Sequence, residues 1–390
     1  MSWKKKFVRN WGRLGMKYKL GEIVDITMGQ SPKSEYYNTE GKGYPFLQGN
    51  RTFGFKYPTF DTYTSVMTKQ AKSGDVIMSV RAPVGDLNIT PVNMCLGRGV
   101  CSLRMKNGNQ DFLFYMMKYY IPHLLKKESG TVFGSVNRND ISGLEVDIPE
   151  DVKVQKKIAR YLEMMDDKIE LNNAINNNLE QQALALYENI FCMPSDIDTK
   201  HISLSDLMDY AGGSQPPASE FVFSEREGYI RFVQIRDYDT DNHITYIPSS
   251  PKNKLCEEHD IMIARYGASL GRICFGINGA YNVALAKVFP KKSFFREFLR
   301  CYLSSRTFYE GINNKGGRSA QAGFNQSDIS SFELDFPIDE TIIRNFECTV
   351  APMFEQRLQL KKENQYLASL RDTLLPRLMS GELDVSNIEI

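Results

Sequence analysis

Residues 137–149 read NRNDISGLEVDIP, and residues 325–337 read NQSDISSFELDFP. Seven of these thirteen positions are identical, and the two segments are separated by nearly half the length of the chain. Self-similarity at a fixed distance is the mark of a repeated structural unit. The chain is therefore predicted to contain two copies of one fold, each ending at one of these segments.

Further segments repeat at a similar distance. GDVIMSVRAPVG (74–85) resembles HDIMIARYGASLG (259–271), and each predicts a strand followed by a glycine-containing turn. LGEIVDITMGQSP (20–32) parallels LSDLMDYAGGSQPP (204–217), and each predicts a short helix or turn that runs into a polar loop. Each half is thus expected to be an α/β unit of roughly 130 residues with a strand-rich middle.

A helical pattern follows each copy of the opening segment. Its apolar positions step by four and three over residues 158–190, and the same steps return in the same register over 346–378. This spacing is a heptad seam and predicts two long helices, each ~35 residues and ~50 Å in length. A single helix with one apolar face is marginal in water, so each helix is expected to pack on the other.

An antiparallel, end-to-end alignment of the two helices predicts facing residues whose numbers sum to 536. The facing pairs are Leu162 with Leu374, Ile169 with Leu367, and Asn172 with Asn364. An Asn172–Asn364 layer would fix the helix register at some cost in stability, although these side chains could instead turn toward solvent. Proline removes a backbone donor, so the second helix is predicted to start or kink at Pro352 and to bend or end at Pro376.

Composition excludes several classes of protein. The chain is 42% apolar and 24% charged with a net charge of +1, as expected of a globular protein, and it has no apolar run long enough for a membrane helix. Its seven cysteines form no CxxC pair and its four histidines have no metal-ligand spacing, so no metal site is predicted. It also has no phosphate-binding glycine loop, and QPPA (215–218) lacks the acid or amide and the aromatic of a methyltransferase motif.

The chain resembles the specificity subunits of type I restriction–modification systems. The resemblance rests on NRNDISGLEVDIP running into QKKIARYLEMMDDKIELNN (155–173), on LRDTLLPRLMSGEL (370–383), and on the doubled architecture. It covers residues 17–385. It implies two similar α/β (α+β) target-recognition domains separated by two long antiparallel coiled-coil helices, with pseudo-twofold symmetry.

The resemblance and the repeat together predict six segments. They are a basic N-terminal extension (1–16), recognition domain one (17–149), helical spacer one (150–192), recognition domain two (193–337), helical spacer two (338–385) and a tail (386–390). Met16 is a second possible start, so the basic extension is expected to be untranslated, with a nucleic-acid arm as the alternative.

The resemblance also implies a function without catalysis. Each recognition domain would read one half of a bipartite double-stranded DNA target, and the helices would set the spacer between the halves. Two modification (methyltransferase) subunits carrying S-adenosylmethionine would dock on the polar helix faces, at residues such as Glu163 and Lys361. Two restriction (translocase–nuclease) subunits using ATP and Mg would complete the complex, in a prokaryotic cytoplasm, with no cofactor bound by this chain. An enzyme of another type, or a scaffold that binds peptides, remains an alternative.

Base reading needs Arg, Lys, Asn or Gln on exposed loops, and phosphate contacts need cations or backbone amides. Loops with these residues recur in both halves. The candidates are Gln30, Ser31, Lys33, Asn50, Arg51, Arg81, Arg138, Ser214, Gln215, Gln234, Arg236, Arg265, Tyr266, Lys315, Arg318, Ser319 and Gln321.

Three of these predictions have structural alternatives. Arg265 could be a partly buried, paired arginine, and the loop that holds Arg318 could be a mobile surface loop. The aromatic stretch GFKYPTFDTYT (54–64) could be core or an edge over a DNA groove. Asn137 and Asn325 are identical in both copies, whereas residues reading different half-sites should differ, so they are predicted to cap turns.

Overall fold

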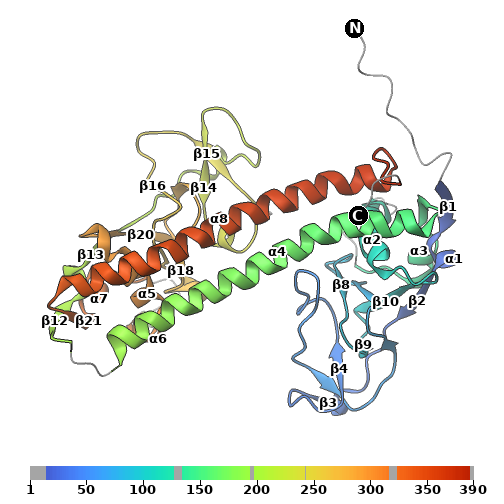
Figure 1. Ribbon diagram of the computed structural model, residues 1–390, viewed down its shortest axis with the longest axis horizontal. Coiled ribbons are helices and arrows are strands. Elements are labelled where there is room, and N and C mark those ends of the chain that lie inside the picture. The colour runs from blue at the N-terminus through green and yellow to red at the C-terminus, as the bar shows by residue number, and fades with distance from the viewer. Residues whose placement is uncertain (1–14, 127–133, 194–196, 242, 316–322, 387–390) are drawn as a thin grey trace, which may run out of the picture. The chain divides into compact units, whose positions relative to one another are not determined.

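The computed structural model describes residues 15–126, 134–193, 197–241, 243–315 and 323–386. The chain forms two compact units: residues 1–171 with 363–390, here unit 1, and residues 172–362, here unit 2. It passes from the first to the second within helix α4 (Val152–Tyr187) and returns within helix α8 (Glu340–Met379). Each unit therefore combines one α/β region, here called its head, with a part of both helices (Figure 1).

The unit 1 head contains three small sheets. β1 (Gly15–Lys19) pairs antiparallel with β11 (Glu145–Pro149). The central sheet has the order β2 (Val24–Met28), β10 (Val100–Met105), β7 (Val76–Ser79), β8 (Leu87–Ile89). The third has the order β3 (Tyr37–Asn38), β5 (Tyr63–Thr64), β4 (Tyr44–Leu47), β9 (Met94–Leu96), β6 (Gln70–Ala71), and its β4–β9 pair is parallel. The head's helices are α1 (Leu20–Ile23), α2 (Gln110–Lys126) and α3 (Arg138–Ser142).

The unit 2 head repeats this topology, with four strands rather than five in its third sheet. β12 (Thr199–Ser203) pairs with β21 (Glu333–Pro337). The central sheet has the order β13 (Met208–Gly212), β20 (Leu285–Pro290), β17 (Met262–Ala264), β18 (Ile273–Cys274). The third has the order β15 (Tyr246–Pro248), β14 (Tyr229–Val233), β19 (Gly279–Tyr281), β16 (Leu255–Cys256), again with one parallel pair, β14–β19. The helices are α5 (Arg296–Ser304), α6 (Arg306–Lys315) and α7 (Gln326–Ser330).

The predicted duplication is thus confirmed at the level of strand order. α7 and β21 follow α3 and β11 at one constant offset, the same offset that separates the two opening segments. One local prediction was incomplete: a strand, β2 or β13, lies between the first turn of each head and its polar loop. The first copy carries the sequence pattern of a strand, because apolar and polar residues alternate at Val24, Asp25 and Ile26. In the structure Val24 and Ile26 are buried and Asp25 is exposed.

The two helices pack antiparallel within each unit. In unit 1, Ile158 and Leu162 of α4 are fully buried in the same apolar cluster as Leu374 and Leu378 of α8. Arg371 donates a hydrogen bond to Asp166 at 2.6 Å there, and in unit 2 Arg357 donates one to Glu180 at 2.9 Å.

In both ion pairs the residue numbers sum to 537, one away from the predicted 536. The Asn172–Asn364 layer stays a prediction. Asn172 is buried and Asn364 is half-buried, but they belong to different units.

A start or a kink of the second helix was predicted at Pro352, and the start is wrong. α8 begins at Glu340, where Asp339 accepts a hydrogen bond from the backbone amide of Thr341 at 2.9 Å and so caps the first turn. Pro352 lies exposed on a helix that continues through it. The expected end near Pro376 is confirmed, because α8 stops at Met379 and Gly381 takes a φ of +74°.

The two residues predicted to dock partners on polar helix faces lie beside their own heads, and their role in docking stays a prediction. Glu163 lies 3.4 Å from the amino group of Lys56, a side chain that is only 4% exposed, and Asp167 lies 3.5 Å from it. Lys361 is half-buried beside Gly276, and burial lowers the pKa of its amino group. The charge of Glu163 thus serves a contact between α4 and its own head.

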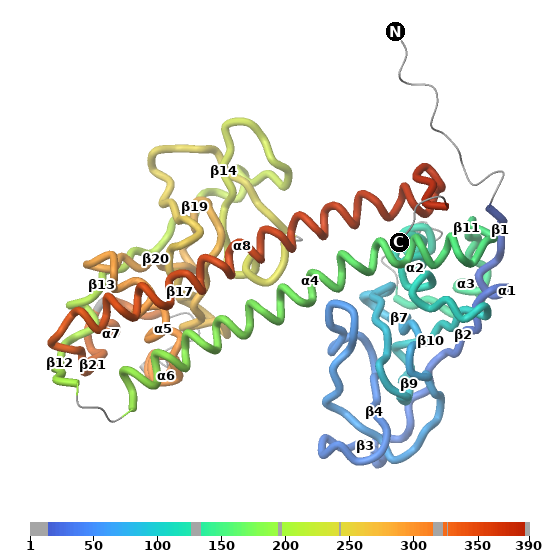
Figure 2. Tube along the Cα trace, viewed as in Figure 1, coloured from blue at the N-terminus to red at the C-terminus, as the bar shows by residue number. Residues whose placement is uncertain are grey.

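The segment between β4 and β5 explains the first of these contacts. It runs back toward α4 (Figure 2), where Lys56 pairs with Glu163. Burial alone would lower the pKa of Lys56, but Tyr57, Glu163 and Asp167 more than offset it, and the pKa is raised. The stretch 54–64 therefore anchors the first head on its helix.

Two absences bear on function. Among the described residues, no helix combines the length and the apolar character needed to cross a membrane. Nor do three or more His, Cys, Asp or Glu side chains of the described ranges gather in a way that could hold a metal ion.

Asp166→Ala is expected to lower the free energy of unfolding by about 3–5 kcal/mol, because Arg371 would keep its charge in a largely buried site without its partner. Tyr115, whose hydroxyl donates to Asp166 at 2.7 Å, would lose its acceptor as well. Urea denaturation at pH 7 measures the loss. Asp372→Ala is the control: this aspartate also contacts Arg371 but is 64% exposed, so its loss should stay under about 1 kcal/mol. Equal losses for the two variants would contradict the assignment.

Candidate nucleic-acid interface

Three chain segments meet at the ends of the strands in the unit 1 head. Gly29 follows β2, Gln48 follows β4, and the turn 97–99 joins β9 to β10. The Gly97 amide donates to Leu47 O at 2.8 Å, and the Gly99 amide donates to Gln48 O at 3.0 Å. A Cβ on Gly29 would lie 2.0 Å from Gly97 O, so only glycine permits this approach. The backbone alone therefore sets the geometry of the surface above.

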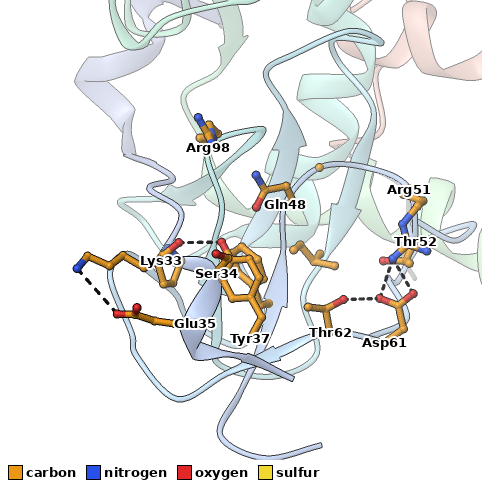
Figure 3. Close-up of a pocket in the computed structure, with 14 residues that line it drawn as sticks. Lys33, Ser34, Glu35, Tyr37, Gln48, Arg51, Thr52, Asp61, Thr62 and Arg98 are labelled. Atoms are coloured by element: carbon orange, nitrogen blue, oxygen red, sulfur yellow. Dashed lines mark hydrogen bonds and ion pairs between the residues drawn. The ribbon is translucent and has the colours of Figure 1, made fainter. Parts of the chain in front are cut away.

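A cleft of about 700 Å³ opens beside this junction (Figure 3). Three cations line it: Lys33, Arg51 and Arg98. Figure 3 shows the first two on opposite sides of the cleft, each joined to a carboxylate, with Arg98 above and no dashed line to it. Such a site offers cations, amides and hydroxyls to a polyanion or to base edges.

The carboxylates neutralise two of the three cations. Lys33 lies 3.9 Å from Glu35, and Arg51 lies 2.7 Å from Asp61. The hydrogen bond from Arg51 holds the pKa of the Asp61 carboxyl below its usual value. Among the described residues, no carboxylate lies within ion-pair distance of Arg98.

The unit 2 head builds the same junction with other side chains. Gly213 and Ser214 follow β13, Gln234 follows β14, and the turn 282–284 joins β19 to β20. A Cβ on Gly213 would lie 2.1 Å from Asn282 O, which parallels the close approach at Gly29. The two heads thus share a backbone at this surface and differ in the residues that it presents.

Of the predicted residues in the unit 1 head, those from the segments after β2 and β4 lie close together, except for Asn50. Lys33 and Arg51 line the cleft, and Ser31 connects its segments because it donates to Gln48 Oε1 at 3.1 Å and accepts from the Arg98 amide at 3.1 Å. Gln30 contributes its backbone to the junction through its amide, which donates to Leu96 O at 2.9 Å. Asn50 instead donates to Asp86, outside the residues that line the cleft.

The other predicted residues are more dispersed. Arg81 is exposed and forms a β-bridge with Ser135, and Arg138 is exposed as the first residue of α3. In unit 2, Gln215 and Arg236 are exposed, whereas Gln234 donates to Thr245 Oγ1 at 3.3 Å. Lys315 is the last residue of α6. Arg318, Ser319 and Gln321 lie outside the described residues.

Arg265 was predicted, as the alternative to a DNA contact, to be a partly buried and paired arginine. It is half-buried, but in the described part of the chain it has no carboxylate partner. Its amide donates to Ala284 O, as the amide of Val80 donates to Gly99 O, so it occupies the place of a buried valine. Gly212, the equivalent of Met28 in strand register, leaves room for the guanidinium. The guanidinium lies 5.2 Å from the ring centre of Tyr266. Because Arg265 corresponds to Val80, Tyr266 rather than Arg265 is in register with Arg81.

Asn137 and Asn325 are confirmed as structural residues. The side chain of Asn137 accepts hydrogen bonds from the amides of Asn139 and Asp140 at 2.8 and 3.2 Å. That of Asn325 accepts from Ser327 and Asp328 at 2.8 and 3.1 Å. Identical capping in both copies explains why these two residues do not differ.

Arg98 is the lining cation that sequence reasoning missed. It lies in LGRGV (96–100), where the flanking glycines indicate a turn but nothing marks the arginine as a binding residue. Comparison with YNVAL (281–285) would have revealed it, since the same turn there carries valine.

Comparison with known proteins adds to this geometry. Residues 15–181 match a family described as "Type I restriction modification DNA specificity domain". The putative type I restriction enzyme MjaX specificity subunit of Methanocaldococcus jannaschii is 39% identical over 158 residues, which cover 40% of this chain and 37% of that relative. The MjaIX specificity subunit of the same organism is 23% identical, and the match covers 95% of this chain and 94% of the relative.

A solved structure shares the fold. The type I restriction–modification S subunit from M. genitalium superposes with a TM-score of 0.58 at 16% identity, covering 97% of this chain and 98% of that one. The predicted fold class and the predicted resemblance are both confirmed by these comparisons. The relatives are named as specificity subunits, the class predicted from the sequence in preference to an enzyme.

Replacing Asn137 with Ala is expected to cost about 1 kcal/mol of stability and to leave DNA base preference unchanged, because the side chain caps α3 and reads nothing. Urea denaturation and gel shifts over a panel of duplexes give the two readouts. Asn325→Ala should behave alike, and Asn139→Ala, at an exposed neighbour, should cost nothing. A change in base preference without a loss of stability would contradict the capping role.

Proposed function

We propose that the chain is a type I restriction–modification specificity subunit and that it reads a bipartite double-stranded DNA target with one head on each half-site. One observation carries the proposal: two copies of the same backbone junction present different side chains at the same places. A protein reading one sequence twice would keep these side chains alike. A protein reading two different half-sites needs a constant frame and variable contacts.

In this proposal the helices have two tasks. They connect the heads and so set the nonspecific spacer between the half-sites, and they carry the partner subunits. The heads themselves supply no chemistry. S-adenosylmethionine, ATP and Mg would be bound by two modification subunits and two restriction subunits, in the cytoplasm of a prokaryote.

One face of the helix pair in unit 1 is suited to a partner. Met164 and Leu171 of α4 are 50% and 55% exposed, and Tyr366 of α8 is 67% exposed. Between them Lys168 lies 3.7 Å from Glu363, which joins the two helices on this face. Residues 164, 168 and 171 share one stripe of α4, on the other flank from Glu163, which contacts the head. We assign this stripe, rather than Glu163 or Lys361, to the docking of a modification subunit.

Leu171→Asp is expected to weaken assembly with the modification subunit by about tenfold or more, since it places a charge in the apolar centre of the contact. Co-purification and titration by analytical ultracentrifugation measure the effect. Leu255→Asp is the matched control, because Leu255 is 53% exposed on β16 of the other unit and belongs to neither helix. The same assembly constant for both variants would remove the stripe from the interface.

Arg318→Ala is expected to weaken DNA affinity of the assembled methyltransferase without loosening subunit assembly, because a glycine-rich loop with cations suits close approach to phosphates. Gel shifts at two salt concentrations test this, with Arg306→Ala, an exposed cation paired to Glu310 on α6, as the control. Unchanged affinity would take the loop out of the DNA interface.

Two other functions are tested in the same preparation. An enzyme in the heads would turn over labelled S-adenosylmethionine or ATP in the isolated chain, and no turnover is expected. A peptide-binding scaffold would leave the assembled complex indifferent to target DNA, whereas the proposal predicts preference for one duplex over random sequence.

A further inference from the structure

The turns 97–99 and 282–284 occupy the same place in the two heads. Each joins the parallel strand of the third sheet to the long strand of the central sheet. Each also lies against the chain that leaves the paired parallel strand, β4 or β14. Their middle residues are Arg98 and Val283, and both are exposed.

Five backbone hydrogen bonds around these turns are equivalent in the two heads, and one differs: the Gly99 amide donates to Gln48 O at 3.0 Å, whereas the Ala284 amide donates to the Asn282 side chain at 3.1 Å. The turn's first amide donates to the last residue of the paired parallel strand, as Gly97 to Leu47 O of β4 at 2.8 Å and Asn282 to Val233 O of β14 at 3.1 Å. The turn closes on itself through Val100 to Gly97 O at 3.2 Å and Leu285 to Asn282 O at 3.0 Å.

Three further pairs complete the match. In the first head they are Val80 to Gly99 O, Gly29 to Val100 O and Gln30 to Leu96 O. In the second they are Arg265 to Ala284 O, Gly213 to Leu285 O and Ser214 to Tyr281 O. Five equivalent bonds hold both middle residues at corresponding positions, so the two heads present an arginine and a valine from the same place in the fold.

The chemistry argues against a phosphate contact. Phosphates are present in every half-site, so a side chain that served them would be expected to carry a donor in both heads. The side chain of valine has no donor. A position that tolerates both arginine and valine, exposed on an invariant frame, is suited instead to contacts that depend on the base.

Arg98 also has the freedom that such a contact needs. The other two cations of the cleft are engaged by Glu35 and Asp61, whereas Arg98 meets no carboxylate within the described ranges. Its backbone is fixed by the Ser31 hydroxyl, so its guanidinium is presented from a rigid base. Arginine donates a bidentate pair to O6 and N7 of guanine, and an aliphatic side chain packs on the 5-methyl of thymine.

We propose that the middle residue of this turn is a base-reading position in each head, with Arg98 contacting a guanine of the first half-site and Val283 contacting a thymine methyl of the second. The assignment rests on the proposed function and names the base class that each head accepts at one position. If the unaltered protein does not recognise a bipartite DNA target, the proposed function is refuted. The outcomes below concern the turn alone.

The side chains of the two turns can be exchanged as a matched pair of substitutions, because each already occurs at the equivalent position of the other head. Arg98→Val and Val283→Arg should therefore both fold. The unaltered protein, assembled with its modification subunits, is first used to find its DNA target. Each variant is then measured on duplexes in which single base pairs of that target are changed.

Arg98→Val is expected to reduce discrimination at one guanine of the first half-site by roughly 5- to 150-fold and to leave the second half-site unaffected. Replacing that guanine with 7-deazaguanine should weaken binding of the unaltered protein but not of the variant. Val283→Arg should convert a thymine preference in the second half-site to guanine, and deoxyuridine in place of that thymine should weaken only the protein that retains Val283.

Two results would overturn the assignment. If Arg98→Val weakens binding equally on all duplexes and lowers the salt dependence by about one ion, Arg98 contacts a phosphate. If neither exchange changes base preference at any position, the turn lies outside the DNA interface.

Discussion

The approach of three backbone segments without side chains between them is the constraint on which the reading surface depends. At Gly29, Gly99 and Gly213, a Cβ would lie 2.0 to 2.3 Å from a carbonyl oxygen of a neighbouring segment. Contacts this close exclude any other residue. In exchange, the turn that carries Arg98 or Val283 is held by hydrogen bonds that do not depend on the side chain that it presents. Such a frame lets the presented residue change without a change of fold, which a reader of two different half-sites requires.

The register of the two helices depends on a different interaction, between paired charges. An apolar seam alone would allow two antiparallel helices to slide by a heptad. Asp166 and Arg371 in unit 1, and Glu180 and Arg357 in unit 2, place opposite charges at a single register. Asp166 is fully buried, and the hydroxyl of Tyr115 brings α2 of the head into the same network. Buried charge is costly unless it is paired, so it specifies one alignment more strongly than it stabilises it.

The sequence predicted the large features because they rest on repetition and periodicity. Two similar segments half a chain apart, and a seam that repeats at the same offset, were enough for two heads and antiparallel helices with facing numbers near 536. What failed depended on particular neighbours. Pro352 was expected to start or kink a helix, and the helix in fact begins at Glu340, where Asp339 caps it. A helical pattern also does not show that Lys56 will contact Glu163 or that Gly276 will lie beside Lys361. Arg98 was missed because its meaning lies in the contrast with Val283, and that contrast is visible only once the strand registers align the two turns.

Independence of the two heads is the central claim, and a methylome tests it most directly. Single-molecule sequencing of DNA from a strain that expresses this chain with its modification subunit should give a motif of two short specific blocks separated by an unspecified spacer. Replacing residues 17–149 with the recognition domain of another specificity subunit should change one block and leave the other block in place. A continuous motif, or a replacement that alters both blocks together, would contradict the account.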